Sequence, residues 1–343
     1  MPLPPLTQAQ LAGQRVIYSY PGLTPPASLL SRIAHGEAAG VIFFARNVGT
    51  PSQFAAAVHE LDQAAESSHN PVHLPLLLMT DQEGGVVRRL PGPPDLSARQ
   101  VGQASDPATA AAQAGSEAAA NLRDHGLNVN LAPVLDVYRQ AGNFIDQYGR
   151  SFGTDSQAVA KLGTAYAAAE QKAGVAATGK HFPGLGAAAQ PQDTDLRPVT
   201  LPLSASAISG VDERPYRSAI AAGIRLIMLS WAVYPALDPH RPAGLSPVIV
   251  GELRHRLGFT GVTVTDAMEA GALRPFGSVG DRAVLAANAG MDLLLCSQGK
   301  VSQGSSAAAA LRNAYSRGSL PSGAFRSAAA RVIALREWLA ARA

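Results

Sequence analysis

Residues 258–268 read GFTGVTVTDAM and hold the strongest structural signal in this chain. β-branched residues favour a pleated strand, so residues 262–265 are predicted to form a short buried strand. Asp266 follows at the carboxyl end of that strand, where α/β proteins place their chemistry. Its carboxylate suits a catalytic group, a ligand contact or the N-cap of the next helix, and this stretch alone leaves all three open.

Short apolar runs recur along the rest of the chain, each followed by an Ala-rich stretch with helical spacing. Strands that alternate with helices pair in parallel through right-handed crossovers. Eight such units predict a (β/α)8 barrel of the α/β class, and residues 1–343 are expected to form one domain. A doubly wound open sheet is the alternative, but no Gly-x-Gly-x-x-Gly turn follows the first strand. Strands are predicted near residues 15–18, 40–44, 76–80, 129–131, 176–179, 226–229, 262–265 and 293–295. Helices are predicted near residues 52–66, 107–125, 156–173, 212–222, 247–257 and 281–289, and within the tail 305–343.

The composition narrows the class of protein. The 343 residues are 47% hydrophobic and 15% charged, with a net charge of +3, and no basic run suggests nucleic acid as a partner. Cys296 is the only cysteine, which excludes an intrachain disulfide and a cysteine-based metal cluster. Residues 1–5 lack the features of a signal peptide, and no apolar run approaches the ~20 residues that span a bilayer. We therefore expect a cytoplasmic protein with no membrane partner, no metal and no organic cofactor.

Polar side chains gather where the predicted strands end. Asp81 and Glu83 follow the third strand within Asp-Gln-Glu-Gly-Gly, and Lys180 and His181 follow the fifth. In a barrel these ends share one face, so the side chains are expected to meet there. For the acidic motif a turn with a helix cap is the alternative, and for the Lys-His pair a structural salt bridge. Farther on, Asp193 and Asp195 stand two residues apart in a loop and could equally be a solvated acidic turn.

Taken together, six segments resemble glycoside hydrolase family 3, and above all the single-domain bacterial β-N-acetylhexosaminidases of the peptidoglycan-recycling type. They occur in the order of that family and cover about residues 40–275. The matching segments are GVIFFARN (40–47), DQEGG (81–85), LAPVLDV (131–137), GRSFG (149–153), KHFPG (180–184) and GFTGVTVTDAM (258–268).

The resemblance implies a retaining mechanism, in which a carboxylate nucleophile forms a covalent glycosyl-enzyme and a second group acts as acid/base. By motif position Asp266 matches the nucleophile, and Met268 falls where the family places a residue close to the sugar. The residues that match those holding the sugar in the terminal subsite are Asp81, Arg89, Arg150, Lys180 and His181.

One departure from the family pattern concerns the acid/base. The family loop continues from Lys-His-Phe-Pro-Gly to an Asp-x-His pair whose histidine transfers the proton, whereas this chain has Asp193-Thr194-Asp195. Asp195 could take over the proton transfer if burial or Asp193 raises its pKa. Another residue could serve instead, or the acid/base could be absent and the protein be a weak enzyme or a sugar binder.

The sequence thus predicts a retaining exo-β-N-acetylglucosaminidase that releases terminal GlcNAc from peptidoglycan fragments through a glycosyl-Asp266 intermediate, with Asp195 and Asp193 as the remaining catalytic residues. A β-glucosidase or other exo-glycosidase on the same barrel, and a non-catalytic muropeptide-binding protein, are the alternatives. The expected partner is a GlcNAc-containing muropeptide or oligosaccharide, and the expected state is a monomer. A carboxylate acid/base repels an incoming phosphate, so water is the predicted acceptor.

Overall fold

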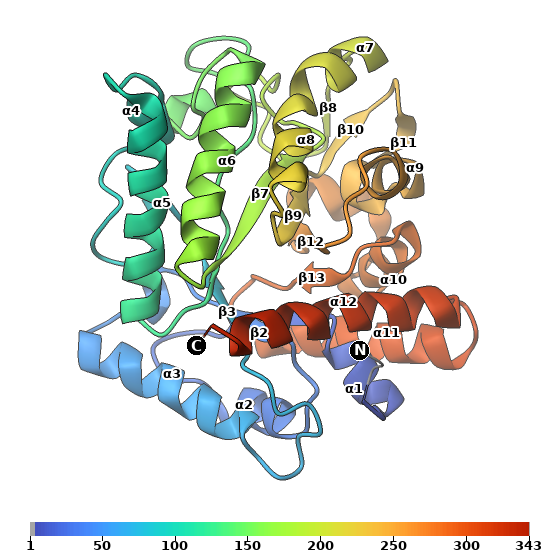
Figure 1. Cartoon of the computed structure of the whole chain (residues 1–343). Coiled ribbons are helices and arrows are strands. Elements are labelled where there is room, and N and C mark those ends of the chain that lie inside the picture. The colour runs from blue at the N-terminus through green and yellow to red at the C-terminus, as the bar shows by residue number, and fades with distance from the viewer. Residues whose placement is uncertain (1–3, 343) are drawn as a thin grey trace.

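Eight parallel strands close into a barrel in the computed structural model, which describes residues 4–342. Around the barrel the strand order is β1, β13, β12, β9, β7, β6, β3 and β2, so each strand neighbours the next one in the chain (Figure 1). The predicted (β/α)8 barrel is confirmed. The strands are β1 (Val16–Tyr18), β2 (Gly40–Ile42), β3 (Leu77–Thr80), β6 (Val129–Asn130), β7 (Ala176–Phe182), β9 (Leu226–Leu229), β12 (Val262–Ala267) and β13 (Leu293–Leu295).

Helices surround the barrel and match the predicted segments closely. Local chemistry sets their first residues: Thr50 accepts a hydrogen bond from the Gln53 amide ahead of Pro51, and Asp155 caps the helix that follows it. The helices are α1 (Gln8–Gly13), α2 (Ala27–Ala34), α3 (Pro51–Ala65), α4 (Ala98–Gly102), α5 (Pro107–Asp124), α6 (Ser156–Lys172), α7 (Ala205–Ala207), α8 (Arg214–Ala221), α9 (Pro247–Gly251), α10 (Val279–Ala289), α11 (Val301–Ser316) and α12 (Ser322–Ala340).

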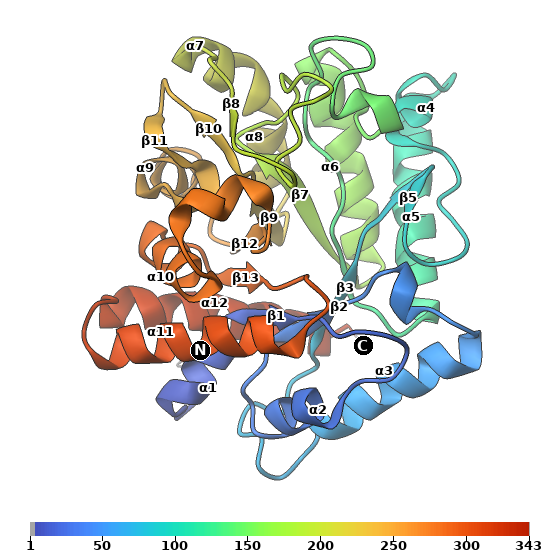
Figure 2. The same cartoon turned by 180° about the vertical axis from the view of Figure 1, so that it is seen from behind.

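Several short elements were not predicted from the sequence. They include a hairpin, β4 (Gln82–Gly84) with β5 (Val87–Arg88), which occupies the loop after β3. A three-stranded sheet of β8 (Val199–Thr200), β10 (Ala232–Tyr234) and β11 (Asp238–Pro242) lies beside α7 and α8 (Figure 2). Strand β11 reads DPHRP, and proline is uncommon inside a sheet, so its pattern did not indicate a strand. Single-turn helices are η1 (Ala45–Asn47), η2 (Asp146–Tyr148), η3 (Ile208–Asp212), η4 (Ala243–Leu245), η5 (Glu252–Arg256) and η6 (Gly271–Phe276).

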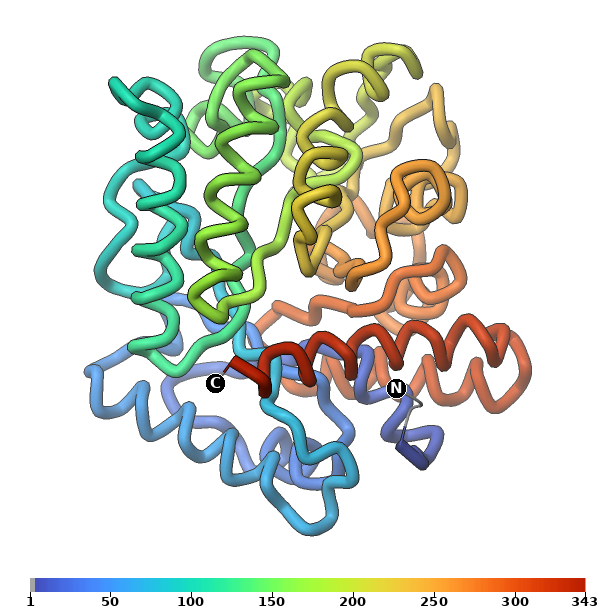
Figure 3. The backbone as a smooth tube through the Cα atoms, viewed as in Figure 1, coloured from blue at the N-terminus to red at the C-terminus, as the bar shows by residue number. Residues whose placement is uncertain are grey.

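The core has two layers because side chains alternate between the two faces of each strand. One set, to which all eight barrel strands contribute, forms a cluster that includes Ile17, Leu77 and Val264. The opposite set packs against the surrounding helices. At the end of the chain, α11 and α12 lie on the side of the molecule that carries the N-terminus (Figure 3). Arg336 of α12 is buried there and donates hydrogen bonds to the carbonyl oxygens of Leu74 and Pro75.

Among residues 4–342, no helix combines the length and the apolar character needed to cross a bilayer. Within the same range, His, Cys, Asp and Glu side chains do not gather in groups of three or more that could hold a metal ion.

Candidate active site

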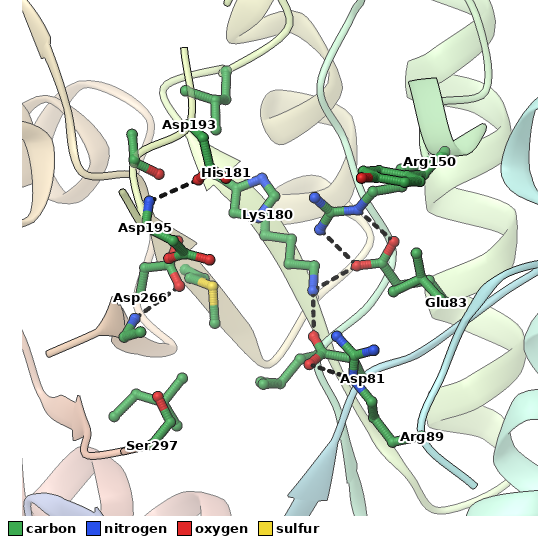
Figure 4. Close-up of a pocket in the computed structure, with 18 of the residues that line it drawn as sticks. Asp81, Glu83, Arg89, Arg150, Lys180, His181, Asp193, Asp195, Asp266 and Ser297 are labelled. Atoms are coloured by element: carbon green, nitrogen blue, oxygen red, sulfur yellow. Dashed lines mark hydrogen bonds and ion pairs between the residues drawn. The ribbon is translucent and has the colours of Figure 1, made fainter. Parts of the chain in front are cut away.

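A pocket of about 480 Å³ opens at the carboxyl ends of the barrel strands. The barrel geometry brings together all but one of the side chains that the sequence singled out, from segments as far apart as β3 and β12 (Figure 4). The predicted residues that line this pocket are Asp81, Arg89, Arg150, Lys180, His181, Asp193, Asp195 and Asp266.

The floor of the pocket is a network of buried charges. The ammonium of Lys180, whose side chain is 2% exposed, lies 2.7 Å from Asp81 Oδ1 and 2.8 Å from Glu83 Oε1. Arg150 grips the same Glu83 with two parallel hydrogen bonds of 2.9 and 2.7 Å, the fork geometry that holds a carboxylate most firmly. Arg89 Nε lies 3.7 Å from Asp81 Oδ2. The network therefore presents fixed donors and acceptors to whatever enters the pocket.

The cations keep both carboxylates of this network ionised. Burial alone would raise the pKa of Asp81, but Lys180 and Arg89 outweigh it and lower that pKa. Burial likewise acts against ionised Glu83, yet Arg150 and Lys180 hold its pKa well below the usual range. In turn, the two carboxylates overcome burial and raise the pKa of Lys180. At neutral pH the floor is thus fully charged and internally paired.

His181 is oriented by a buried carboxylate at the end of β6. Its Nδ1 lies 2.7 Å from Asp136 Oδ2, and Asp136 Oδ1 accepts a 2.6 Å hydrogen bond from the Leu185 amide. An acceptor at Nδ1 places the ring proton on that nitrogen, which leaves Nε2 as the atom available to a ligand. The imidazole is therefore fixed in one orientation beside Lys180.

Asp266 lies at the carboxyl end of β12, as its place after the β-branched run predicted. Its Oδ1 accepts a 2.7 Å hydrogen bond from the amide of Ala267, and the Ala267 carbonyl accepts one of 2.9 Å from the Trp231 indole. The carboxylate is partly buried and lines the pocket. It does not cap a helix, because η6 begins only at Gly271, so the capping alternative is wrong.

The loop that carries Asp195 is docked against the chain that leaves β12. The amide of Gly271 donates a 2.7 Å hydrogen bond to the Asp195 carbonyl, and the amide of Ala272 donates one of 3.0 Å to the Thr194 carbonyl. Within the loop, Asp193 Oδ1 accepts the Asp195 amide at 2.8 Å. Glycine is needed at 271, because a Cβ there would lie 2.2 Å from the carbonyl oxygen of the residue after Asp195.

Docking sets Asp195 beside Asp266 (Figure 4). The protein around it removes part of its hydration, and the carboxylates of Asp266, Asp193 and Glu269 add repulsion, which together raise the pKa of Asp195 to about 7. Asp195 still touches solvent at the pocket mouth. A carboxyl group that is half protonated near neutral pH next to a second carboxylate is the arrangement that acid/base chemistry needs.

Met268 is not brought to this site. Its side chain is fully buried in the layer between barrel and helices, and it does not line the pocket. In a strand and the turn after it, adjacent side chains point to opposite faces, so position two after Asp266 does not ensure a shared pocket.

Four residues of the site were not singled out from the sequence as site residues. Glu83 and Asp136 stand in quoted motifs at strand ends, and that position was the available signal. Glu269 accepts hydrogen bonds from the Ser297 hydroxyl (2.8 Å) and from Gln303 Nε2 (2.8 Å), and Ser297 lines the pocket. No local pattern marks this pair, because the two residues come from the loops after different strands.

Comparisons with known proteins agree with this geometry. The family pattern described as Glycosyl hydrolase family 3 N terminal domain matches residues 9–335. An uncharacterized secreted glycosyl hydrolase of Arthroderma benhamiae is 48% identical over 331 residues, 96% of this chain and 93% of that protein. A beta-hexosaminidase of Nitrosomonas eutropha is 34% identical over 275 residues, 77% of this chain and 75% of that protein.

Two solved structures resemble the whole chain. A glycoside hydrolase family 3 beta-N-acetylglucosaminidase from Paenibacillus sp. FPU-7 superposes with a TM-score of 0.90 at 36% identity. The match covers 99% of this chain and 64% of the Paenibacillus protein, so this chain spans just under two thirds of it. A beta-N-acetylhexosaminidase from Beutenbergia cavernae superposes with a TM-score of 0.88 at 32% identity, covering 98% of this chain and 100% of that one.

Proposed function

The chain belongs to glycoside hydrolase family 3, and from that premise we propose that it is a retaining exo-β-N-acetylglucosaminidase with Asp266 as nucleophile and Asp195 as acid/base. As a member of this family the chain is a glycosidase, and its relatives support the β-N-acetylhexosaminidase class. The observation that carries the assignment of roles is the placement of Asp195 beside Asp266, with a pKa raised to about 7.

The first step forms a glycosyl ester. A carboxylate oxygen of Asp266 attacks the anomeric carbon, the bond from that carbon to the leaving oxygen breaks, and protonated Asp195 gives its proton to that oxygen. In the second step ionised Asp195 takes a proton from water while the water oxygen attacks the anomeric carbon. The ester bond to Asp266 breaks, the sugar leaves with its original configuration, and both carboxyl groups return to their starting states.

The charged floor positions the terminal sugar. Lys180, Arg89 and Arg150 offer donors to hydroxyl oxygens, while Asp81 offers an acceptor. Because each of these groups is held by an ion pair before ligand arrives, the site loses little side-chain entropy on binding. Asp193 acts through the backbone: by accepting the Asp195 amide it shapes the turn that presents the acid/base.

Substrate, acceptor and location extend the proposal. Terminal GlcNAc of peptidoglycan fragments is the substrate that the family resemblance predicts, and water is the acceptor because a carboxylate at position 195 repels phosphate. Product analysis in phosphate buffer checks the acceptor, since sugar 1-phosphate would contradict it. A cytoplasmic location also stays a prediction. The Arthroderma relative carries the word secreted in its name, so fractionation of the native host is the appropriate measurement.

The catalytic assignment can be tested with two substrates. Release of nitrophenol from p-nitrophenyl N-acetyl-β-glucosaminide reports the nucleophile, because this leaving group needs little protonation. Asp266→Asn should abolish it, whereas Asp195→Asn should lower kcat/KM on N,N′-diacetylchitobiose by about 10²–10⁴-fold and spare the aryl glycoside more. Asp124→Asn, on an exposed residue at the end of α5, is the matched control.

Two outcomes would contradict the assignment. Turnover that survives in Asp266→Asn would show that another group is the nucleophile. Faster hydrolysis of p-nitrophenyl β-glucoside than of the N-acetyl substrate by the wild type would favour the β-glucosidase alternative. A folded wild type that turns over neither substrate would favour a sugar-binding protein.

A further inference from the structure

The pocket changes from charged to apolar between its floor and its mouth. Lys180 and Glu83 at the floor have side chains only 2% and 5% exposed, whereas Val86 and Tyr148, which line the same pocket, are 73% and 54% exposed. Leu196, next to Asp195 in the chain, is 58% exposed. We call Val86, Tyr148 and Leu196 the mouth cluster.

Large exposed hydrophobic side chains are few in residues 4–342, and half of them belong to this cluster. Six such residues are exposed, and the other three are Leu23, Leu96 and Val248. Isolated exposed hydrophobic residues need no explanation, but a group of them at the rim of a pocket marks a binding surface.

The backbone under the cluster is built to hold it in place. Tyr148 ends η2, whose Asp146 is buried and accepts a 2.8 Å hydrogen bond from Arg99 Nε. The loop is joined to the one that carries Asp195 through the side chains of Gln147 and Gln190, 3.2 Å apart. A ring on a fixed backbone offers contact area at a small entropic cost.

We propose that the mouth cluster is a subsite for the leaving group and that it takes a neutral pyranose ring, the next β-linked sugar of the substrate. This inference rests on the proposed exo-glycosidase function. The terminal sugar fills the polar floor, so the rest of the substrate must extend through the mouth. Asp195 protonates the leaving oxygen, which places the leaving group at Leu196 and across from Tyr148.

The chemistry of the cluster selects an uncharged ring. One face of a β-linked pyranose exposes C–H groups, and an aromatic ring packs against such a face. The cluster itself carries no charge, and the nearest cations of the floor, Arg150 and Lys180, are already paired with Glu83. A leaving group with a carboxylate would lose hydration at the mouth without gaining an ion pair.

The test compares leaving groups with and without a ring. In Tyr148→Ala, kcat/KM on N,N′-diacetylchitobiose should fall by about five- to tenfold, while kcat/KM on methyl N-acetyl-β-glucosaminide should stay within about twofold of the wild type. Tyr148→Phe keeps the ring and should retain chitobiose activity. Val86→Ala should act in the same direction as Tyr148→Ala, and Val248→Ala, an exposed valine outside the pocket, is its control. The wild type should also prefer chitobiose over the disaccharide of GlcNAc and N-acetylmuramic acid.

The outcomes separate this subsite from the catalytic proposal. Equal losses on chitobiose and on the methyl glycoside in Tyr148→Ala would overturn the subsite, because they place Tyr148 at the first sugar. A preference for the muramic acid disaccharide would overturn the selection of a neutral ring. A wild type that hydrolyses none of these substrates would instead overturn the proposed function, and the subsite with it.

Discussion

Gly271→Ala should detach the acid/base from an otherwise intact active site. A Cβ at position 271 would lie 2.2 Å from the Leu196 carbonyl oxygen and 2.3 Å from its carbon. Carbon atoms in contact stand about 3.5–4.0 Å apart, so the two segments must separate by about 1 Å. That shift weakens the hydrogen bond between the Gly271 amide and the Asp195 carbonyl and moves Asp195 away from Asp266.

A misplacement of about 1 Å costs on the order of 100-fold in rate, or about 2.7 kcal/mol of transition-state stabilisation. The loss should appear in kcat/KM on N,N′-diacetylchitobiose, whose leaving group requires a proton. An activated dinitrophenyl glycoside, which needs none, should lose less than about tenfold. It reports Asp266 and also shows that the variant is folded. Gly323→Ala is the control, since a Cβ there meets no other atom within 4 Å.

The reasoning would be refuted by either of two results. Unchanged chitobiose hydrolysis would show that the contact at Gly271 does not set the position of Asp195. Equal losses on both substrates would show that the added methyl group acts on Asp266 instead.

Three further predictions concern the pH profile, the charged floor and the core. With the pKa of Asp195 near 7, kcat/KM on chitobiose should fall as the pH rises above about 7, because the acid loses its proton; Glu269→Gln removes a repelling charge and should move this limb of the profile to lower pH. Glu83→Gln leaves buried cations without their counter-charge and should lower the free energy of unfolding, measured in urea, by about 3 kcal/mol. A rise in stability would contradict the role of Glu83. Met268→Leu conserves volume in the core, so it should cost less than about 1.5 kcal/mol and leave KM for p-nitrophenyl N-acetyl-β-glucosaminide unchanged; a raised KM would return Met268 to the sugar site.

The barrel could be predicted because its signals are local. β-branched runs such as residues 262–265 favour strands wherever they occur, and caps such as Thr50 fix helix starts without help from the rest of the chain. The hairpin after β3 and the sheet containing β11 depend on pairing between segments, which a single-sequence pattern shows poorly.

The site divides along the same line. Strand-end positions indicated Asp81, Lys180 and Asp266, because a barrel brings all its carboxyl strand ends to one face. The pKa of Asp195 could not be read from the sequence, since it depends on carboxylates that approach only after folding. A mobile lid was expected around this residue from its neighbouring glycines and alanines. The structure instead docks the loop through backbone hydrogen bonds at residues 194 and 195.

Docking by main-chain atoms makes position 195 an exchangeable socket. The hydrogen bonds that hold the loop to Gly271 and Ala272 use only amides and carbonyls, which every residue except proline supplies in full. A different side chain at 195 would therefore be presented at the same point of the pocket. This freedom explains how the acid/base can differ between relatives on an unchanged barrel, and it makes residue 195 the natural place to retune the enzyme between water and anionic acceptors.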